Sequence, residues 1–204
     1  MAEDRRVRKS KNAIKNAFIQ LLKEKNIERI TIQEISDLAD VNRGTFYLNY
    51  VDKYALLEEM EYEQIAEIKS FVDIRNINLS NRTGEAFIEE FSNNVIKKVI
   101  THISNNLEFY QVILNLERKS QIEEQLADIV RSNLTYLIED KHDVFGIPIN
   151  YYLSYVTGSM MSMIKYWVSD DQRVSIDEIV QYIATIASNG PLSIMRRMVD
   201  QKNK

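Results

Sequence analysis

The sequence predicts an all-α fold, and three observations support this. Apolar residues recur at spacings of three and four along the 204-residue chain, which is the period of an amphipathic helix. Glycine and proline are scarce, with five and two copies, and no segment shows the alternation and turn dipeptides of strands. Residues suited to begin helices also follow one another closely near the N-terminus. We therefore expect an N-terminal three-helix unit that contains a helix-turn-helix, followed by a larger helical bundle.

The first helix carries one apolar stripe and is preceded by basic residues. The stripe follows the pattern i, i+3, i+4, i+7, i+8 and ends before Asn26, which predicts a helix with one core-facing side. The stripe consists of Ile14, Ala17, Phe18, Leu21 and Leu22, and the basic run before it of Arg5, Arg6, Arg8, Lys9 and Lys11.

Three helix starts of one design lie between residues 31 and 57. Thr31, Asn42 and Asp52 are good N-cap residues. Each follows a branched apolar residue and precedes, by four positions, a large apolar one, as in a hydrophobic staple. The three pairs are Ile30 with Ile35, Val41 with Phe46, and Val51 with Leu56. Thr31 and Glu34 also form a capping-box pattern. We expect helices over 32–39 and 43–49, with Phe46 and Tyr50 in the core, and a longer helix over 53–72.

Further helices are expected after an Asn- and Ser-rich loop at 73–83. Helical spacing predicts them at 84–103, 107–116, 118–140, 149–168 and 176–188. Gly146 and Pro148 separate two of them. Ser175 and Glu178 repeat the capping-box pattern at the start of the last, and Gly190 followed by Pro191 predicts its end.

Composition narrows the function. There is no cysteine and there are two distant histidines, so a catalytic or metal cluster is poorly supplied and we expect no metal and no cofactor. The chain also lacks a Gly-rich phosphate loop and a Ser-His-Asp set, which disfavours an enzyme. Residues 1–53 carry 11 basic and 8 acidic side chains, and the rest 15 and 22. A basic head on an acidic body suits contact with a polyanion, although ordinary surface charge accounts for it equally well.

The chain reads as a cytoplasmic protein without membrane contact. Its charged N-terminus has no apolar run of the kind found in signal peptides. Residues 144–164 carry no charge and are long enough to span a bilayer, but polar residues and Pro148 interrupt them, so we expect a buried helix instead.

Residues 31–57 resemble the DNA-binding domain of the tetracycline-repressor (TetR) family. The family's spacing of Gly-Thr, aromatic-Tyr and Lys is kept in the segment Val41-Asn42-Arg43-Gly44-Thr45-Phe46-Tyr47-Leu48-Asn49-Tyr50, followed by Asp52-Lys53 and Ala55-Leu56-Leu57. Asp40 replaces the usual turn glycine, a change that Asp can tolerate if the backbone is left-handed there. Leu48 and Asn49 replace commoner residues and leave the DNA sequence open. The resemblance implies a DNA-binding domain at 1–55 and a ligand-binding and dimerisation domain at 56–204.

The resemblance also implies roles for individual side chains. Arg43 and Thr45 would reach base edges, and Gly44 would let the backbone approach. Thr31, Tyr47 and Lys53 would contact phosphates. The full predicted DNA surface is Thr31, Asn42, Arg43, Gly44, Thr45, Tyr47, Asn49 and Lys53. Thr31 and Asn42 serve equally well as caps alone.

The C-terminal part resembles the family in architecture. Small residues at i, i+4 and i+8 permit close helix packing, so we expect a four-helix dimer interface. Its predicted residues are Ser154, Tyr155, Gly158, Ser162, Trp167, Ile179, Ile183 and Ile186. A ligand pocket is expected at Tyr62, Phe87, Phe91, Phe109, Tyr110, Ile113 and Tyr136. The segment MSMIKYWVSDD is similar to a Gram-positive subgroup that includes dihydroxyacetone-kinase operon activators.

The resulting hypothesis is a homodimeric transcriptional regulator, a repressor, that binds a palindromic operator in double-stranded DNA and responds to a small-molecule effector. The alternative is a helical interaction module of the same fold that has lost DNA binding or ligand response. A helical enzyme is the third possibility, and it is the least favoured because the sequence offers no recognisable set of catalytic residues.

Overall fold

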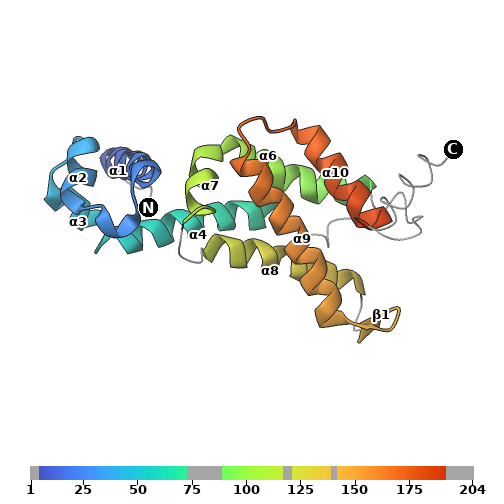
Figure 1. Cartoon of the computed structure of the whole chain (residues 1–204). Coiled ribbons are helices and arrows are strands. Elements are labelled where there is room, and N and C mark those ends of the chain that lie inside the picture. The colour runs from blue at the N-terminus through green and yellow to red at the C-terminus, as the bar shows by residue number, and fades with distance from the viewer. Residues whose placement is uncertain (1–4, 73–88, 117–120, 139–141, 192–204) are drawn as a thin grey trace. The chain divides into compact units, whose positions relative to one another are not determined.

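The computed structural model describes residues 5–72, 89–116, 121–138 and 142–191, apart from the side chains of 134 and 136–138. The chain divides into two compact units, which are described separately. The first unit comprises Met1–Ala66 and Glu108–Ile122, and the second comprises Glu67–Leu107 and Glu123–Lys204. The described residues are almost entirely helical, which confirms the predicted all-α class (Figure 1).

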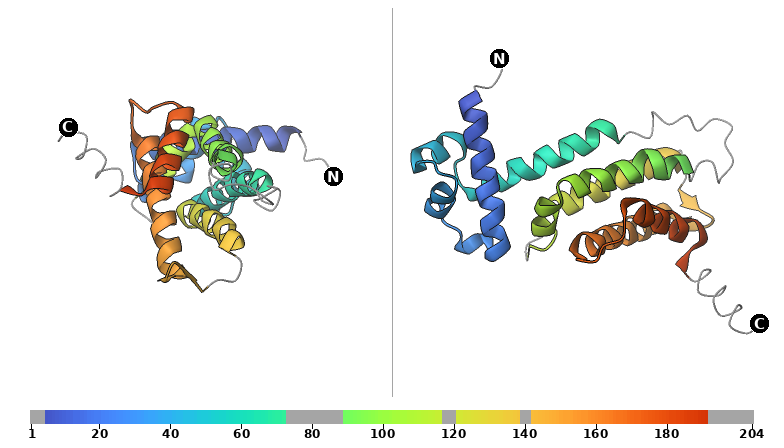
Figure 2. Two further views of the ribbon diagram at one scale, coloured as in Figure 1. Left: turned by 90° about the vertical axis from the view of Figure 1, so that its right-hand side faces the viewer. Right: turned by 90° about the horizontal axis from the view of Figure 1, so that it is seen from above.

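The first unit begins with α1 (Arg5–Glu24), a short 3-10 turn η1 (Ile27–Arg29), α2 (Ile32–Leu38) and α3 (Arg43–Asn49). Most of α4 (Lys53–Phe71) and of α7 (Leu107–Ile113) also belongs to it. Helix α1 packs against both α2 and α3 (Figure 2). Their shared core includes Ile14, Phe18, Ile35, Phe46 and Leu56, each fully buried.

The second unit contains a π-helical turn η3 (Ser92–Ile96) that runs directly into α6 (Lys97–Asn105). It also contains α8 (Gln121–Ile138), α9 (Ile149–Ser169) and α10 (Ile176–Asn189). Helix α10 packs against α6 and α9. Buried apolar residues of this unit include Ile100, Ile103, Leu126, Ile164 and Val168.

Most predicted helix starts are confirmed. The side chains of Thr31, Asn42 and Ser175 accept hydrogen bonds from the backbone N–H three residues later, and both capping boxes are complete. The Asp52 carboxylate accepts from the N–H groups of Tyr54 and Ala55, each at 2.8 Å. The third staple is wrong: Val51 is 79% exposed while Leu56 is buried, so the two do not pack together.

Other boundaries differ from the predictions. The expected helix 84–103 includes the π-helical turn, while residues 84–88 and the expected loop 73–83 lie outside the described residues. A two-stranded antiparallel hairpin, β1 (Asp143–Val144) and β2 (Ile147–Pro148), was not expected before α9. Its turn uses positive φ at Phe145 and Gly146, and the Gly146 N–H donates to Asp143 Oδ1 at 2.8 Å.

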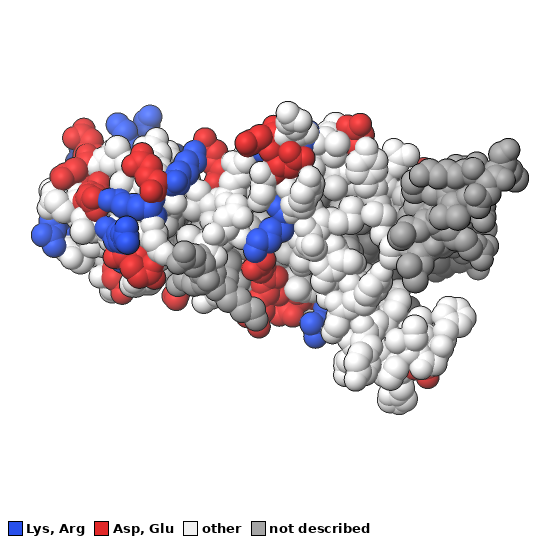
Figure 3. Space-filling view, viewed as in Figure 1, with Lys and Arg blue, Asp and Glu red and all other residues white. Residues whose placement is uncertain are grey.

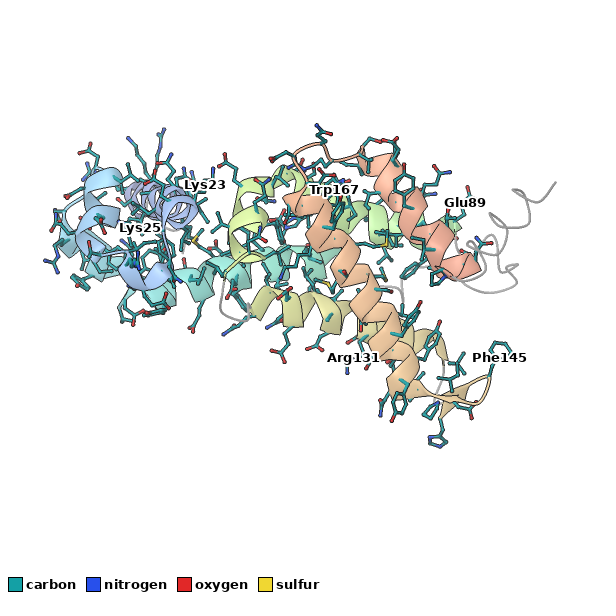
Figure 4. All side chains as sticks on the ribbon, viewed as in Figure 1. Lys23, Lys25, Glu89, Arg131, Phe145 and Trp167 are labelled. Atoms are coloured by element: carbon teal, nitrogen blue, oxygen red, sulfur yellow. The ribbon has the colours of Figure 1, made fainter. Side chains whose placement is uncertain are left out.

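The hairpin presents an aromatic ring to solvent. Phe145 is fully exposed, and Figure 4 shows its ring at the tip, directed away from α9.

Among the described residues, no helix is both long and apolar enough to cross a membrane.

Candidate nucleic-acid interface

Helix α3 has one buried side and one exposed side. Phe46 is fully buried and Tyr50, which ends the helix, is 4% exposed, which confirms both as core residues. Two residues are half a turn of helix, so Gly44 and Leu48 lie on the side opposite Phe46. Both are exposed, and Leu48 is 87% exposed. The core contact of Phe46 therefore fixes which side of α3 faces outward.

The turn before α3 has the geometry that its sequence requires. Asp40 takes φ 53°, the left-handed conformation expected for a residue that replaces glycine. The Val41 N–H then donates to the carbonyl of Ser36 at 3.0 Å, which closes the turn. Asn42 follows as the N-cap of α3.

Several polar groups of α3 are bonded within the helix and its cap. The Thr45 N–H and hydroxyl donate to Asn42 Oδ1 at 2.7 and 3.0 Å. The Asn49 amide donates to the Thr45 carbonyl at 2.7 Å. Asn42, Thr45 and Asn49 thus have structural roles in this helix, whatever they contact in a complex.

Arg43 and Tyr47 form an exposed pair on α3. The guanidinium of Arg43 lies 5.9 Å from the centre of the Tyr47 ring, and its Nη2 is 3.5 Å from the phenol oxygen. Both side chains are exposed, Tyr47 by half. The ring holds the guanidinium beside the outward face through a cation–π contact. A fixed planar guanidinium is the group best suited to bidentate contact with guanine or phosphate.

The predicted phosphate role of Thr31 is weakened by its partner. The Thr31 N–H and hydroxyl both donate to a carboxylate oxygen of Glu34, at 2.9 Å each. Lys25 forms an ion pair with the same carboxylate. Lys25, and then the Thr31 donors, lower the pKa of Glu34 to about 2. The start of α2 therefore already holds a negative charge where the prediction placed a phosphate.

Lys53 likewise has partners within the first unit. Its ammonium donates to the carbonyl of Glu28 at 3.0 Å and to that of Ile30 at 2.8 Å. Two of its three donors are thus used to join the start of α4 to the segment before α2. Sequence spacing placed Lys53 on phosphate and missed this role, because both carbonyls lie more than twenty residues earlier in the chain.

A second exposed surface lies on α9. Its residues share one side of the helix, at spacings of three and four, and no residue from Val144 to Ile164 is charged. The face of the molecule shown in Figure 3 is largely uncharged over this helix. We call this surface the α9 stripe; it consists of Tyr151, Tyr155, Gly158, Ser162 and Tyr166, all exposed.

The predicted dimer residues divide between this surface and the core. Tyr155, Gly158 and Ser162 lie in the α9 stripe, and Ser154 is exposed beside them. Trp167, Ile179 and Ile183 are at most 5% exposed within the chain itself, and the Trp167 indole N–H donates to the carbonyl of Val174 at 2.8 Å. Ile186 is partly exposed. The buried three pack inside the second unit, so we no longer assign them to a dimer contact.

The seven predicted pocket residues are not brought together among the described residues. Of those whose side chains the structure describes, only Phe91 lines the apolar cavity described next. Tyr62 is 72% exposed, and Phe109, Tyr110 and Ile113 are buried in the first unit. Phe87 and the side chain of Tyr136 lie outside the described residues.

A small apolar cavity lies within the second unit. Its volume is about 30 Å³, and its walls come from the π-helical turn, α6, α8 and α9. The described wall residues are apolar apart from Asn133, and include Val95, Ile100, Leu126, Ile129, Met160 and Ile164. This volume is large enough to hold a water-sized molecule and far below that of a typical ligand site.

Two family models match the chain. Residues 14–60 match "Bacterial regulatory proteins, tetR family", and residues 90–189 match "Transcriptional regulator C-terminal region", a TetR model. An uncharacterized HTH-type transcriptional regulator of Bacillus subtilis, YxbF, is 23% identical over 188 residues, or 86% of this chain. The chain spans 44% of the length of that relative.

Solved structures share the fold. A TetR transcriptional regulator from Streptococcus agalactiae is 24% identical, with a TM-score of 0.62 over 90% of this chain and 96% of that one. FadR of Bacillus subtilis, solved with stearoyl-CoA, is 16% identical, with a TM-score of 0.60 over 86% of this chain and 96% of that one. The dihydroxyacetone kinase operon activator DhaS is 15% identical, with a TM-score of 0.55 over 87% of this chain and 93% of that one. Together with the two family models, which cover well over half of the residues, this shows that the chain belongs to the TetR family of bacterial transcriptional regulators.

Proposed function

We propose that this chain regulates transcription by placing α3 in the major groove of an operator. The observation that carries the proposal is the outward face of α3, where Arg43 and Tyr47 are exposed as a pair while Phe46 fixes the helix from behind. A short helix held in this way presents its first turn to base edges. We propose repression because occupancy of an operator excludes other proteins from the same DNA.

We further propose that the regulator is a homodimer joined through the α9 stripe, so that its operator is palindromic. Taking about 200 Å² for an aromatic side chain, the exposed parts of Tyr151, Tyr155 and Tyr166 amount to about 400 Å². That is about half of what one partner contributes to a standard interface. Gly158 and Ser162 lie between these rings and allow two helices to approach closely.

DNA titrations test the proposed surface. A duplex recovered from a random library by selection with the purified chain serves as the probe. We expect Arg43→Ala to weaken binding by about 1–3 kcal/mol and to relax the preference at one base position. Tyr47→Ala should weaken all sequences alike if its ring contacts the backbone. Arg131→Ala is the matched control, an exposed arginine of the second unit (Figure 4). Wild-type affinity in both α3 variants would rule out the assigned face.

The apolar cavity supports an effector with a neutral apolar chain. The part of its wall that the structure describes offers no charged group, and Met160 and Met161 are flexible enough to let it widen. The stearoyl-CoA bound by FadR shows that this fold accommodates an acyl chain in another protein. We expect long-chain acyl compounds to raise the Tm of this protein. Ile129→Phe, which fills the cavity, should remove that rise; an unchanged Tm in the wild type would contradict the assignment.

A further inference from the structure

Leu48 is the most exposed large apolar side chain on the outward face of α3. It lies opposite the buried Phe46 and is 87% exposed. The residue one turn before it on the same side is Gly44, which has no side chain. The backbone at Gly44 can therefore come close to a neighbouring surface, and Leu48 then meets that surface first.

The neighbouring residues leave little polar chemistry at this point of the helix. The Thr45 hydroxyl donates to Asn42, so its methyl is the part without a hydrogen-bonding role. The Asn49 amide donates to the Thr45 carbonyl. Arg43 and Tyr47 pair with each other, and each lies one residue, about 100° around the helix, before Gly44 and Leu48. The middle of the face is thus apolar, and Leu48 forms most of it.

In the major groove, the apolar group that distinguishes one base from the others is the C5 methyl of thymine. We infer that Leu48 is a specificity-determining residue that contacts a thymine methyl in each operator half-site. This inference rests on the proposed function, because it requires α3 to lie in the groove. It adds that the half-site contains a thymine that the protein reads without a hydrogen bond.

The test removes only the methyl group. Each thymine in the duplex recovered by selection is replaced singly by uracil, which keeps all hydrogen-bonding groups and lacks the C5 methyl. For the wild-type chain we expect about a four-fold loss of affinity at the contacted position in one half-site. This is the factor for burying about one methylene-sized group, about 0.8 kcal/mol.

Leu48→Ala links the loss to this side chain. The variant should bind the thymine duplex about four-fold or more weakly and should no longer distinguish thymine from uracil at that position. Leu38→Ala is the matched control, because Leu38 is a half-exposed leucine on α2. It should retain the wild-type discrimination. Since Leu48 makes little contact within the chain, its replacement should leave the Tm unchanged, which excludes a folding defect.

The outcomes separate this inference from the function on which it rests. If no duplex is enriched and no sequence is preferred, the proposed DNA binding and the inference both fail. If a duplex is bound specifically but every uracil substitution is neutral, the inference fails and DNA binding stands. The inference also fails if Leu48→Ala still distinguishes thymine from uracil.

Discussion

The exposed side of α3 and the exposed side of α9 are built in different ways. Helix α3 has seven residues, and its orientation depends on one buried side chain, Phe46, and on an Asn42 cap. Helix α9 has 21 residues, a continuous buried side, and a stripe of tyrosines and small residues opposite it. The first surface carries polar groups with defined partners, and the second has no charge over most of its length. Such a contrast is expected if one surface meets nucleic acid and the other meets protein.

The largest expected effect concerns the α9 stripe. Tyr155→Asp would place like charges near each other across a two-fold interface and bury an unpaired carboxylate. We expect the free energy of dimerisation to become less favourable by about 2 kcal/mol or more. The dimer Kd, measured by sedimentation equilibrium, should therefore rise roughly thirty-fold.

Tyr62→Asp is the control for this change. Tyr62 is an exposed tyrosine on α4 outside the stripe, so its replacement should leave the mass in solution unchanged. Equal masses for the wild type and the Tyr155 variant would remove the stripe from the proposed interface.

A smaller effect compares one capping box in each unit. Thr31→Ala and Ser175→Ala should each lower the free energy of unfolding by about 1 kcal/mol.

The glutamates of the two capping boxes, Glu34 and Glu178, both have a lowered pKa. The Ser175 hydroxyl and N–H lower that of Glu178, and Lys25 is the first cause at Glu34. A carboxylate with a lowered folded-state pKa stabilises the fold at neutral pH. For Glu34 this contribution should be lost as pH falls from about 4.5 to about 2.

Carboxyl NMR titration of Lys25→Ala tests whether Lys25 is the main cause of the lowered pKa of Glu34. The midpoint of Glu34 should rise toward the ordinary value because its ion pair is gone, while that of Glu178 should stay where it is. A Glu34 midpoint that does not move would show that the Thr31 donors alone hold its pKa down.

The sequence was sufficient where the interaction is local. Caps bond within three residues, so Thr31, Asn42 and Ser175 were identified from their order in the chain. A left-handed backbone was named as the condition for Asp40 to replace the turn glycine, and Asp40 has it. The hairpin before α9 was missed, because Phe145-Gly146 lacks the Asn-Gly or Asp-Gly signal of a tight turn.

Interactions between distant residues were beyond the sequence. The partners of Lys53 lie in the segment before α2, so its spacing alone suggested a phosphate contact. Periodicity also identified apolar sides of the last two helices without showing what they face. Trp167, Ile179 and Ile183 consequently joined the predicted dimer surface although they lie in the core. The cavity was misplaced for the same reason, since its walls come from four separate elements.

The contacts of Lys53 also have a mechanical consequence. Helix α4 begins at Lys53, and its ammonium is held by two carbonyls that precede α2. Hydrogen bonds to a charged group contribute about 1.5–3 kcal/mol each, so lifting or rotating the first turn of α4 away from that segment carries an energetic penalty. The start of α4 is therefore tied to the segment that leads into α2. A rotation of α4 about its own axis would strain both hydrogen bonds and would pull on the residues just before α2.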